Sequence, residues 1–246
     1  SLARAARTAG LCGEIVGAGR NAAHLQRAVE LGVVDCYDTD LAKAVSGADL
    51  IVVAVPLGAM KTVFAAIKDA LATDAIITDV GSAKASVIDD AVAVFGEMPS
   101  RLVPGHPIAG TENSGVEASF PELFRDRRVI LTPTERTDAQ ATEVVRRLWE
   151  GTGAQVTEME VAHHDEVLAA TSHLPHVLAY TLVETLARMG ERDEIFQYAA
   201  GGFRDFTRIA SSDPVMWRDI CLANHDALLA MVERYQSDLG SLAEAI

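Results

Sequence analysis

Leu50-Ile-Val-Val-Ala-Val-Pro56 is the longest apolar run of the chain, and the mostly apolar segment Ala75-Ile-Ile-Thr-Asp-Val80 follows it. Such runs are typical of strands that are buried on both faces, as in a parallel sheet. Residues 59–71, which lie between them, have the apolar spacing of a helix. This order of strand, helix and strand predicts an α/β fold with helices on both faces of a mainly parallel sheet.

The same alternation continues on both sides of these two strands. Further strands are predicted at 14–18, 101–103, 129–132 and 154–159, and further helices at 1–9, 21–31, 85–95 and 137–150. Beyond them the strand signals nearly stop, and helical spacing is found at 161–170, 174–189 and 214–239, with a glycine-containing loop at 196–213. We therefore expect two domains, an α/β domain at 1–160 and an all-helical domain at 161–246.

The composition excludes several classes of protein. Hydrophobic residues make up 49% of the 246 residues, so the chain folds. A net charge of −14 argues against a nucleic-acid partner and an anionic membrane surface, and an anionic ligand would need local positive charge. No apolar run is long enough to span a membrane. Three widely spaced cysteines have no disulfide or zinc pattern, which favours a reducing cytoplasm.

The segment Gly105-His-Pro-Ile-Ala-Gly-Thr-Glu-Asn-Ser-Gly115 contains the first candidate for chemistry. His106 follows a short apolar run and precedes a loop rich in glycine and hydroxyl groups, which places it at the end of a strand, facing a cleft. A histidine exchanges protons near neutral pH. The alternative is a loop histidine that caps a backbone group.

Several strand ends carry residues that suit a dinucleotide cofactor, because ligands bind beyond the carboxyl ends of parallel strands. Val55, Pro56 and Gly81 lie at two such ends. A third end, Gly17-Ala-Gly-Arg-Asn21, lacks the acid that usually binds the ribose of NAD, and its Arg20 suits a 2′-phosphate. We favour NADP and keep NAD open. A solvated turn arginine is the alternative for Arg20.

Ser82 follows Gly81 and is predicted to hydrogen-bond His106 or a substrate hydroxyl, or else to cap the next helix. Two histidines of the string Ser172-His-Leu-Pro-His176 lie three residues apart, a spacing that metal ligands use. No cysteine or carboxylate completes a standard metal site there, so we expect no metal. A hydrolase triad with Ser82 is disfavoured because the chain has no Gly-x-Ser-x-Gly elbow.

Taken with Gly81-Ser-Ala-Lys84 and the run 201–217, the segment 105–115 resembles the signatures of the prephenate/arogenate dehydrogenase (cyclohexadienyl dehydrogenase) family. The resemblance implies a Rossmann-type domain followed by a helical dimerisation domain, and therefore a homodimer. It implies oxidative decarboxylation of prephenate, arogenate or both, with hydride transfer to NAD(P), in tyrosine biosynthesis. His106 would be catalytic and Ser82 would assist it. Arg208 would hold the ring carboxylate of this anionic substrate, and His173 and His176 would contact its side-chain end.

One departure from the family pattern concerns the first helix. In the family a strand and a Gly-x-Gly-x-x-Gly turn precede such a helix, and both are missing from this sequence, which is therefore expected to be incomplete. Two alternatives stay open, a non-catalytic dinucleotide-binding regulatory protein and another two-domain NAD(P)-dependent reductase. For Arg208 the alternative is a surface ion pair with Asp205 or Asp213.

Overall fold

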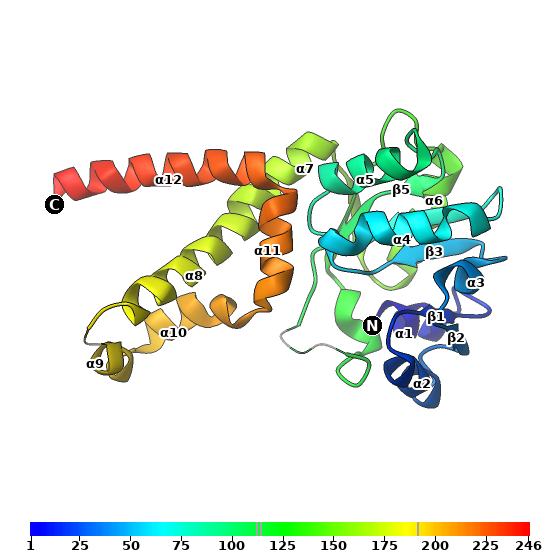
Figure 1. Cartoon of the computed structure of the whole chain (residues 1–246), viewed down its shortest axis with the longest axis horizontal. Helices are drawn as coiled ribbons and strands as arrows, with labels where there is room; N and C mark the ends of the chain where they lie inside the picture. Colours follow the sequence, from blue (N-terminus) through cyan, green and yellow to red (C-terminus); the bar gives the residue numbers. More distant parts are fainter. Residues whose placement is uncertain (112, 114, 191) are drawn as a thin grey trace. The chain divides into compact units, whose positions relative to one another are not determined.

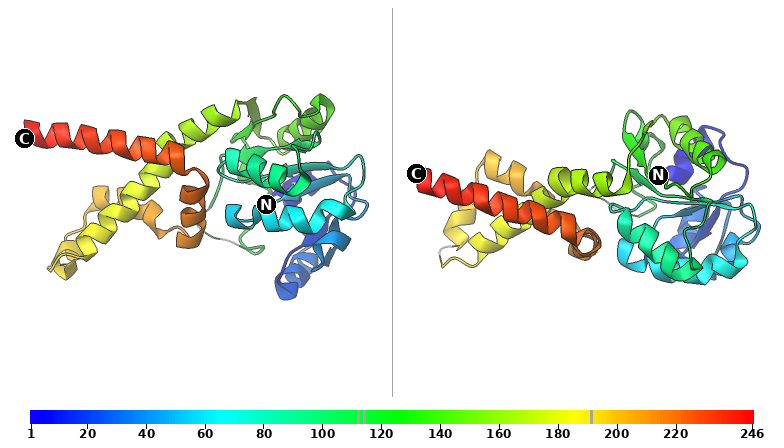
Figure 2. Two further views of the ribbon diagram at one scale, coloured as in Figure 1. Left: turned by 45° about the horizontal axis from the view of Figure 1, so that its top comes forward. Right: turned by 90° about the horizontal axis from the view of Figure 1, so that it is seen from above.

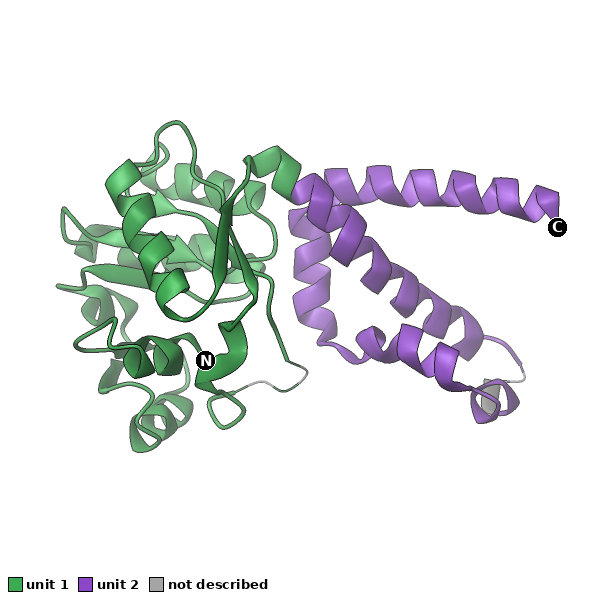
Figure 3. Cartoon of the chain, turned by 180° about the vertical axis from the view of Figure 1, so that it is seen from behind, with its two compact units in different colours: residues 1–164 green, residues 165–246 purple. Residues whose placement is uncertain are grey.

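The computed structural model describes residues 1–111, 113, 115–190 and 192–246. The chain divides into two compact units, Ser1–His164 and Asp165–Ile246 (Figure 3). The sequence predicted the boundary after residue 160. Two positions of the segment 105–115, Glu112 and Ser114, lie outside the described residues.

The first unit is an α/β domain whose strands form three short ladders (Figure 1). In the first, β1 (Val16–Ala18) pairs in parallel with β2 (Cys36–Asp38). In the second, β3 (Leu50–Val53), β4 (Ile76–Asp79) and β5 (Leu102–Val103) are parallel neighbours in that order. In the third, β7 (Arg128–Leu131) lies between β6 (Gly105–Pro107), which is antiparallel to it, and the parallel β8 (Gln155–Glu158). The predicted fold class is confirmed.

Helices cover both faces of these strands. In Figure 2, α4 and α5 lie on one side and α1 and α6 on the other. The helices of this unit are α1 (Leu2–Thr8), α2 (Ala22–Glu30), α3 (Leu41–Val45), α4 (Met60–Ile67), α5 (Ala85–Phe95) and α6 (Ala139–Gly151), with 3₁₀ turns at Leu57–Ala59, Lys68–Ala70 and Pro121–Phe124. Asn21, Asp40 and Asp138 cap α2, α3 and α6 by accepting hydrogen bonds from first-turn N–H groups.

A core cluster on the α1 and α6 side joins those helices to the strands. Ala5, Ile76, Val129 and Trp149 are among its buried members. The rings of Trp149 and Phe124 meet edge to face with centroids 5.1 Å apart, a favoured geometry for aromatic pairs. This packing fixes the strands whose ends carry the candidate site.

The second unit is helical throughout, as predicted. It begins within α7 (Val161–Leu168) and contains a π-helical turn (Ala169–His173), α8 (Leu174–Ala187), α9 (Arg192–Gln197), α10 (Gly201–Thr207), a 3₁₀ turn (Arg208–Ser211), α11 (Pro214–Ala223) and α12 (His225–Ala245). Pro175 lies in the first turn of α8. A proline there has no N–H for a bond to the preceding turn, which accounts for the wider π turn before it.

Two element predictions in this unit are wrong. The expected loop at 196–213 is mostly helical, because Gly201 and Gly202 occupy the first turn of α10, where glycine interrupts few helical bonds. The expected helix at 214–239 is two helices separated at Asn224, whose backbone leaves the helical region at φ −119° and ψ 39°. The Asn224 side chain donates a hydrogen bond to the carbonyl of Asp165 (2.8 Å), which ties this break to the helix that precedes α8.

The outer part of α12 carries several exposed apolar side chains, including Leu239 at 46% and Leu242 at 56% exposure. Figures 1 and 2 show this helix extending beyond the other helices of its unit. Exposed apolar side chains that gather on one element commonly mark a contact surface. Among the described residues, no helix is both long and apolar enough to cross a membrane.

Candidate functional site

His106 lies inside a short strand rather than at a strand end. The strand predicted at 101–103 stops at β5, and Pro104 separates it from β6, in which His106 pairs with Ile130 of β7. Proline cannot donate to a ladder, so the chain changes partner there. The Pro104 carbonyl instead accepts a bond from Thr132 N (2.9 Å). His106 is only 8% exposed, so its ring lies in a largely buried environment.

A buried ion pair holds the backbone directly before His106. Lys84 and Asp79 are both fully buried, and Lys84 Nζ lies 2.5 Å from Asp79 Oδ2. The same ammonium donates to the carbonyl of Gly105 (2.7 Å), and Gly105 N donates to Asp79 Oδ1 (3.1 Å). Gly81 N also donates to Asp79 Oδ2 (2.7 Å). The end of β4 and the start of β6 are therefore fastened together by charge-assisted hydrogen bonds.

The ring of His106 contacts a second histidine that the sequence analysis left without a role. His106 Nδ1 lies 2.9 Å from His164 Nε2. The ring centroids are 5.2 Å apart and the ring planes meet at 66°. His164 is fully buried and comes from α7. The two imidazoles form a hydrogen-bonded pair within the first unit.

The remaining strand-end residues occupy the turns that follow β3 and β4. Val53 and Asp79 are ladder partners, so the turns with Val55 and Gly81 begin at the same edge. A Cβ at Gly81 would come within 2.7 Å of Leu57 Cδ2 and 2.9 Å of Asp79 Oδ2, so only glycine fits without a shift. Val55 is half-buried and Pro56 is exposed. These turns leave backbone and apolar surface at the predicted cofactor edge.

Ser82 is half-buried in the turn after β4. The capping alternative is not observed, because Lys84 occupies the N-cap position of α5. Across the described part of the chain, no hydrogen bond joins Ser82 to His106, whose Nδ1 faces His164. The predicted role of Ser82 toward the substrate hydroxyl is compatible with this placement.

Arg20 lies in the turn between β1 and α2, and its side chain is exposed. The turn itself contains no carboxylate between Gly17 and Asn21. The side chain of Asn21 accepts from His24 N (3.1 Å) and so caps α2. A planar cation beside a helix start suits a phosphate group, so the residues present fit a phosphorylated nucleotide.

The second unit brings together the two histidines predicted to bind substrate and adds two partners. His173 is fully buried, and its Nδ1 lies 3.1 Å from Asn224 Nδ2. His176 stacks on Trp217 with ring centroids 3.5 Å apart and planes at 18°. Trp217 Nε1 is buried and finds no hydrogen-bond partner among the described residues. A buried indole donor in this situation is available to a ligand.

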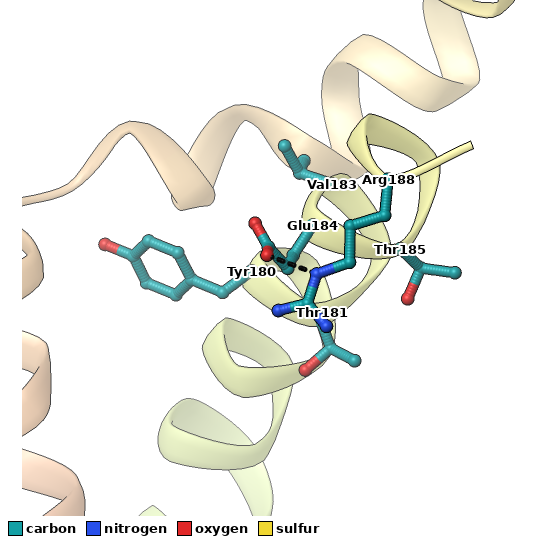
Figure 4. A pocket seen from close by; sticks show the side chains of 6 residues that line it. All are labelled: Tyr180, Thr181, Val183, Glu184, Thr185 and Arg188. Carbon is teal, nitrogen blue, oxygen red and sulfur yellow. Dashed lines mark hydrogen bonds and ion pairs between the residues drawn. The ribbon is translucent and has the colours of Figure 1, made fainter. Parts of the chain in front are cut away.

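Arg208 begins the 3₁₀ turn after α10, and its side chain is exposed in the single chain. Burial lowers the pKa of His176, and the nearby charge of Arg208 lowers it further, while the Ser172 carbonyl acts in the opposite direction. Burial and the charge of Arg208 therefore both favour the neutral form of His176. The same unit has a hollow of about 550 Å³ along α8, lined by Tyr180, Thr181, Val183, Glu184, Thr185 and Arg188 (Figure 4). None of the predicted binding residues lines it.

The sequence reasoning assigned no role to five residues of the site: Asp79, Lys84, His164, Trp217 and Asn224. Lys84 and Trp217 belong to the runs 81–84 and 201–217, which the sequence analysis named, but the sequence does not show what their side chains contact. His164 was visible only as part of His163-His164-Asp165. Nothing in a linear pattern connects it to His106, which is 58 positions away.

Comparison with known proteins identifies both units. Residues 2–158 match the model of the prephenate dehydrogenase nucleotide-binding domain, and residues 160–246 match that of the prephenate dehydrogenase dimerization domain. A solved prephenate dehydrogenase from A. aeolicus, in complex with hydroxyphenyl propionate and NAD⁺, superposes with a TM-score of 0.92 at 40% identity. That comparison covers 99% of this chain and 85% of the solved one.

Two relatives of known activity align along most of the chain. The cyclohexadienyl dehydrogenase of Zymomonas mobilis is 46% identical over 223 residues, which are 89% of this chain and 74% of the relative. The prephenate dehydrogenase of Bacillus subtilis is 38% identical over 87% of this chain. The chain spans 58% of the length of that second relative.

Proposed function

The chain belongs to the prephenate dehydrogenase family, and from this premise we propose that it catalyses the oxidative decarboxylation of prephenate, arogenate or both. Hydride passes to NAD(P), and the reaction serves tyrosine biosynthesis. The observation that carries the proposal is the agreement of both units with the two domains of the family. The buried His106 on its fastened strand supplies the proton chemistry that this reaction needs.

Bound NAD(P) supplies the hydride acceptor. His106 accepts the proton of the substrate hydroxyl as that carbon becomes carbonyl-like, which is general base catalysis. Its Nδ1 lies 2.9 Å from His164 Nε2, and we assign the substrate hydroxyl to its Nε2. Ser82 supports the same hydroxyl. Loss of CO₂ then leaves an aromatic ring, so the step is effectively irreversible.

The second unit orients the substrate. We assign the ring carboxylate to Arg208, because a guanidinium binds a carboxylate through two parallel hydrogen bonds. His176 and His173 contact the side-chain end. The stacked pair of His176 and Trp217, with its buried indole donor, supports a binding surface of aromatic and polar character there.

For the cofactor, Val55, Pro56 and Gly81 line the edge where β3 and β4 end, and Arg20 contacts the ribose end. The exposed Arg20 in a turn without carboxylates supports a preference for NADP over NAD. The structure of the A. aeolicus relative contains NAD⁺, and this is an observation about the relative rather than about this chain. Residues 1–160 then serve as the nucleotide domain and 161–246 as the substrate and dimerisation domain.

We further propose a homodimer formed through the helical unit, in which the exposed leucines of α12 are covered by the second copy. The cytoplasm is the proposed compartment. Its support is that Cys12, Cys36 and Cys221 are free thiols in the structure.

The test is an assay of the full-length protein with prephenate and with arogenate, each with NAD⁺ and NADP⁺, following the absorbance of the reduced nicotinamide. We expect turnover with at least one pair. The His106→Asn variant should bind cofactor normally and turn over about 10²–10⁴-fold more slowly, the usual loss for an acid–base group. No turnover by the wild type with either substrate would refute the proposal, and an active His106→Asn variant would refute the role of His106.

A further inference from the structure

The pair of His106 and His164 is a buried side-chain contact of the first unit, and the proposed function assigns no role to His164 in setting the tautomer of His106. The two nitrogens lie 2.9 Å apart, and both rings are buried, with exposures of 8% and 0%. They come from different elements, β6 and α7. A contact of two polar ring atoms in such a place is a specific hydrogen bond, because two facing lone pairs would repel.

A hydrogen bond between two imidazoles needs one N–H and one lone pair, so two arrangements exist. If His164 donates from Nε2, His106 receives at Nδ1 and carries its own proton on Nε2, where it cannot accept another. If His106 donates from Nδ1, its Nε2 keeps a lone pair and is a base. Only the second arrangement lets His106 take a hydroxyl proton.

The second arrangement also stabilises the product of the proton transfer. When His106 gains a proton at Nε2, it becomes an imidazolium whose Nδ1–H already points to the lone pair of His164 Nε2. The hydrogen bond then becomes charge-assisted, which strengthens it. A neutral His164 thus favours the state in which His106 holds the proton.

Because the backbone beside His106 is fixed, the contact with His164 determines how the His106 ring is oriented. Gly105 is held through both its N–H and its carbonyl by Asp79 and Lys84, so the Cα of His106 has a fixed neighbour. What remains is rotation of the His106 side chain. The bond to His164 removes that freedom and selects the nitrogen that is presented.

We propose that His164 is a positioning residue for His106. It accepts the Nδ1 proton, fixes the Nε2 base tautomer and orients the ring. The expected effect on turnover rests on the proposed function. The expected tautomer of His106 rests only on the geometry of its contact with His164.

The kinetic test compares His164→Leu, which removes the acceptor, with His164→Gln, whose side-chain carbonyl can take the place of Nε2. His163→Gln is the matched control, because His163 is the neighbouring, exposed residue of the same helix. We expect His164→Leu to lower kcat about ten- to a hundred-fold, the range for a lost charge-assisted hydrogen bond, with KM within a few-fold. His164→Gln should recover most of the loss, and His163→Gln should match the wild type.

The second readout is direct. In full-length protein labelled with ¹⁵N-histidine, we expect the His106 ring to carry its proton on Nδ1 in the wild type, with the signal assigned through His106→Asn. In His164→Leu the Nε2–H tautomer should appear. This measurement needs no substrate. The tautomer of His106 is read in the wild-type protein, so the test still works if the variants at position 164 do not fold.

The outcomes separate the two proposals. If the wild type does not turn over either substrate, the proposed function fails, and the tautomer alone decides this inference. If the wild type is active but His164→Leu keeps its kcat, or if His106 carries its proton on Nε2, this inference is overturned and the proposed function stands. A loss in His164→Leu that His164→Gln does not recover also overturns it, because bulk packing then explains the effect.

Discussion

The buried pair of Lys84 and Asp79 should be the most costly polar contact of the first unit to break. Replacing Lys84 with methionine keeps an unbranched side chain, shortened by its terminal atom, and removes the ammonium. The Asp79 carboxylate, fully buried and 2.5 Å from Nζ in the wild type, would then lose its cation. Removing one partner of a buried pair typically costs about 3–5 kcal/mol of folding free energy.

The local contacts refine this magnitude. Asp79 would still accept hydrogen bonds from Gly81 N and Gly105 N, which offset part of the cost. The carbonyl of Gly105 would lose the donor that lies 2.7 Å away, and an unsatisfied buried acceptor costs about 1–3 kcal/mol. These two effects oppose each other, so we expect about 3–5 kcal/mol for Lys84→Met. Converting Asp79 to asparagine in the same variant should recover part of it, because no buried charge remains.

The measurement is urea unfolding of the full-length protein, followed by circular dichroism at one fixed protein concentration, since an oligomer's stability depends on concentration. The control is Arg147→Met, which removes an exposed i, i+4 pair with Glu143 and should cost about 0.5 kcal/mol or less. A cost below about 1 kcal/mol for Lys84→Met, or a double variant no more stable than the single one, would show that the pair does not hold β4 to β6.

Three further predictions concern the other predicted roles. Arg208→Ala should raise the substrate KM about ten- to a hundred-fold with cofactor affinity unchanged, and lysine should rescue only partly, as steady-state kinetics would reveal. Arg20→Ala should weaken NADP more than NAD in competitive binding, and a wild-type preference for NAD would contradict the NADP assignment. Because the pKa of His176 lies below its ordinary value of 6.5, its neutral form contributes stability that is present above pH 6.5 and is lost as the pH falls through the lower, folded-state pKa. His176→Phe, which keeps an aromatic stack on Trp217, should therefore flatten the fall in unfolding free energy below pH 6.5.

Those parts of the fold that depend on local pattern could be predicted from sequence. The apolar runs predicted strands, and both are observed: Ile76–Asp79 is buried at every position, whereas Leu50–Val53 alternates between half-buried and buried positions. The segment 196–213 was predicted as a loop because of its glycine pair and mixed composition. The structure makes it helical, since the glycines fall where a helix begins and its later residues pack on α8 and the following 3₁₀ turn. Tertiary packing therefore determines the secondary structure of residues 196–213, and local sequence patterns carry no information about that packing.

The candidate site divides in the same way. His106 could be found because its residue type and its neighbours are unusual within one short run. Lys84 could not be recognised as buried, since lysine is rarely buried and its partner becomes evident only when the turn after β4 is folded. His164 belongs to a helix far along the chain, and its partner was set by the way α7 meets β6. Contacts between residues so far apart in the chain are recognised only in the three-dimensional structure.

His106 therefore has two kinds of support, and they should fail in different ways. The ion pair acts on the backbone of Gly105, inside the sheet, so its loss should appear first as lost stability. The contact with His164 acts on the ring alone, where a lost bond leaves the sheet intact and changes which nitrogen carries a proton. A catalytic base must be held within a few tenths of an ångström and in one tautomer. The ion pair fixes the position of the backbone but not the tautomer, and the contact with His164 fixes the tautomer but not the backbone. A catalytic base at position 106 therefore needs both contacts.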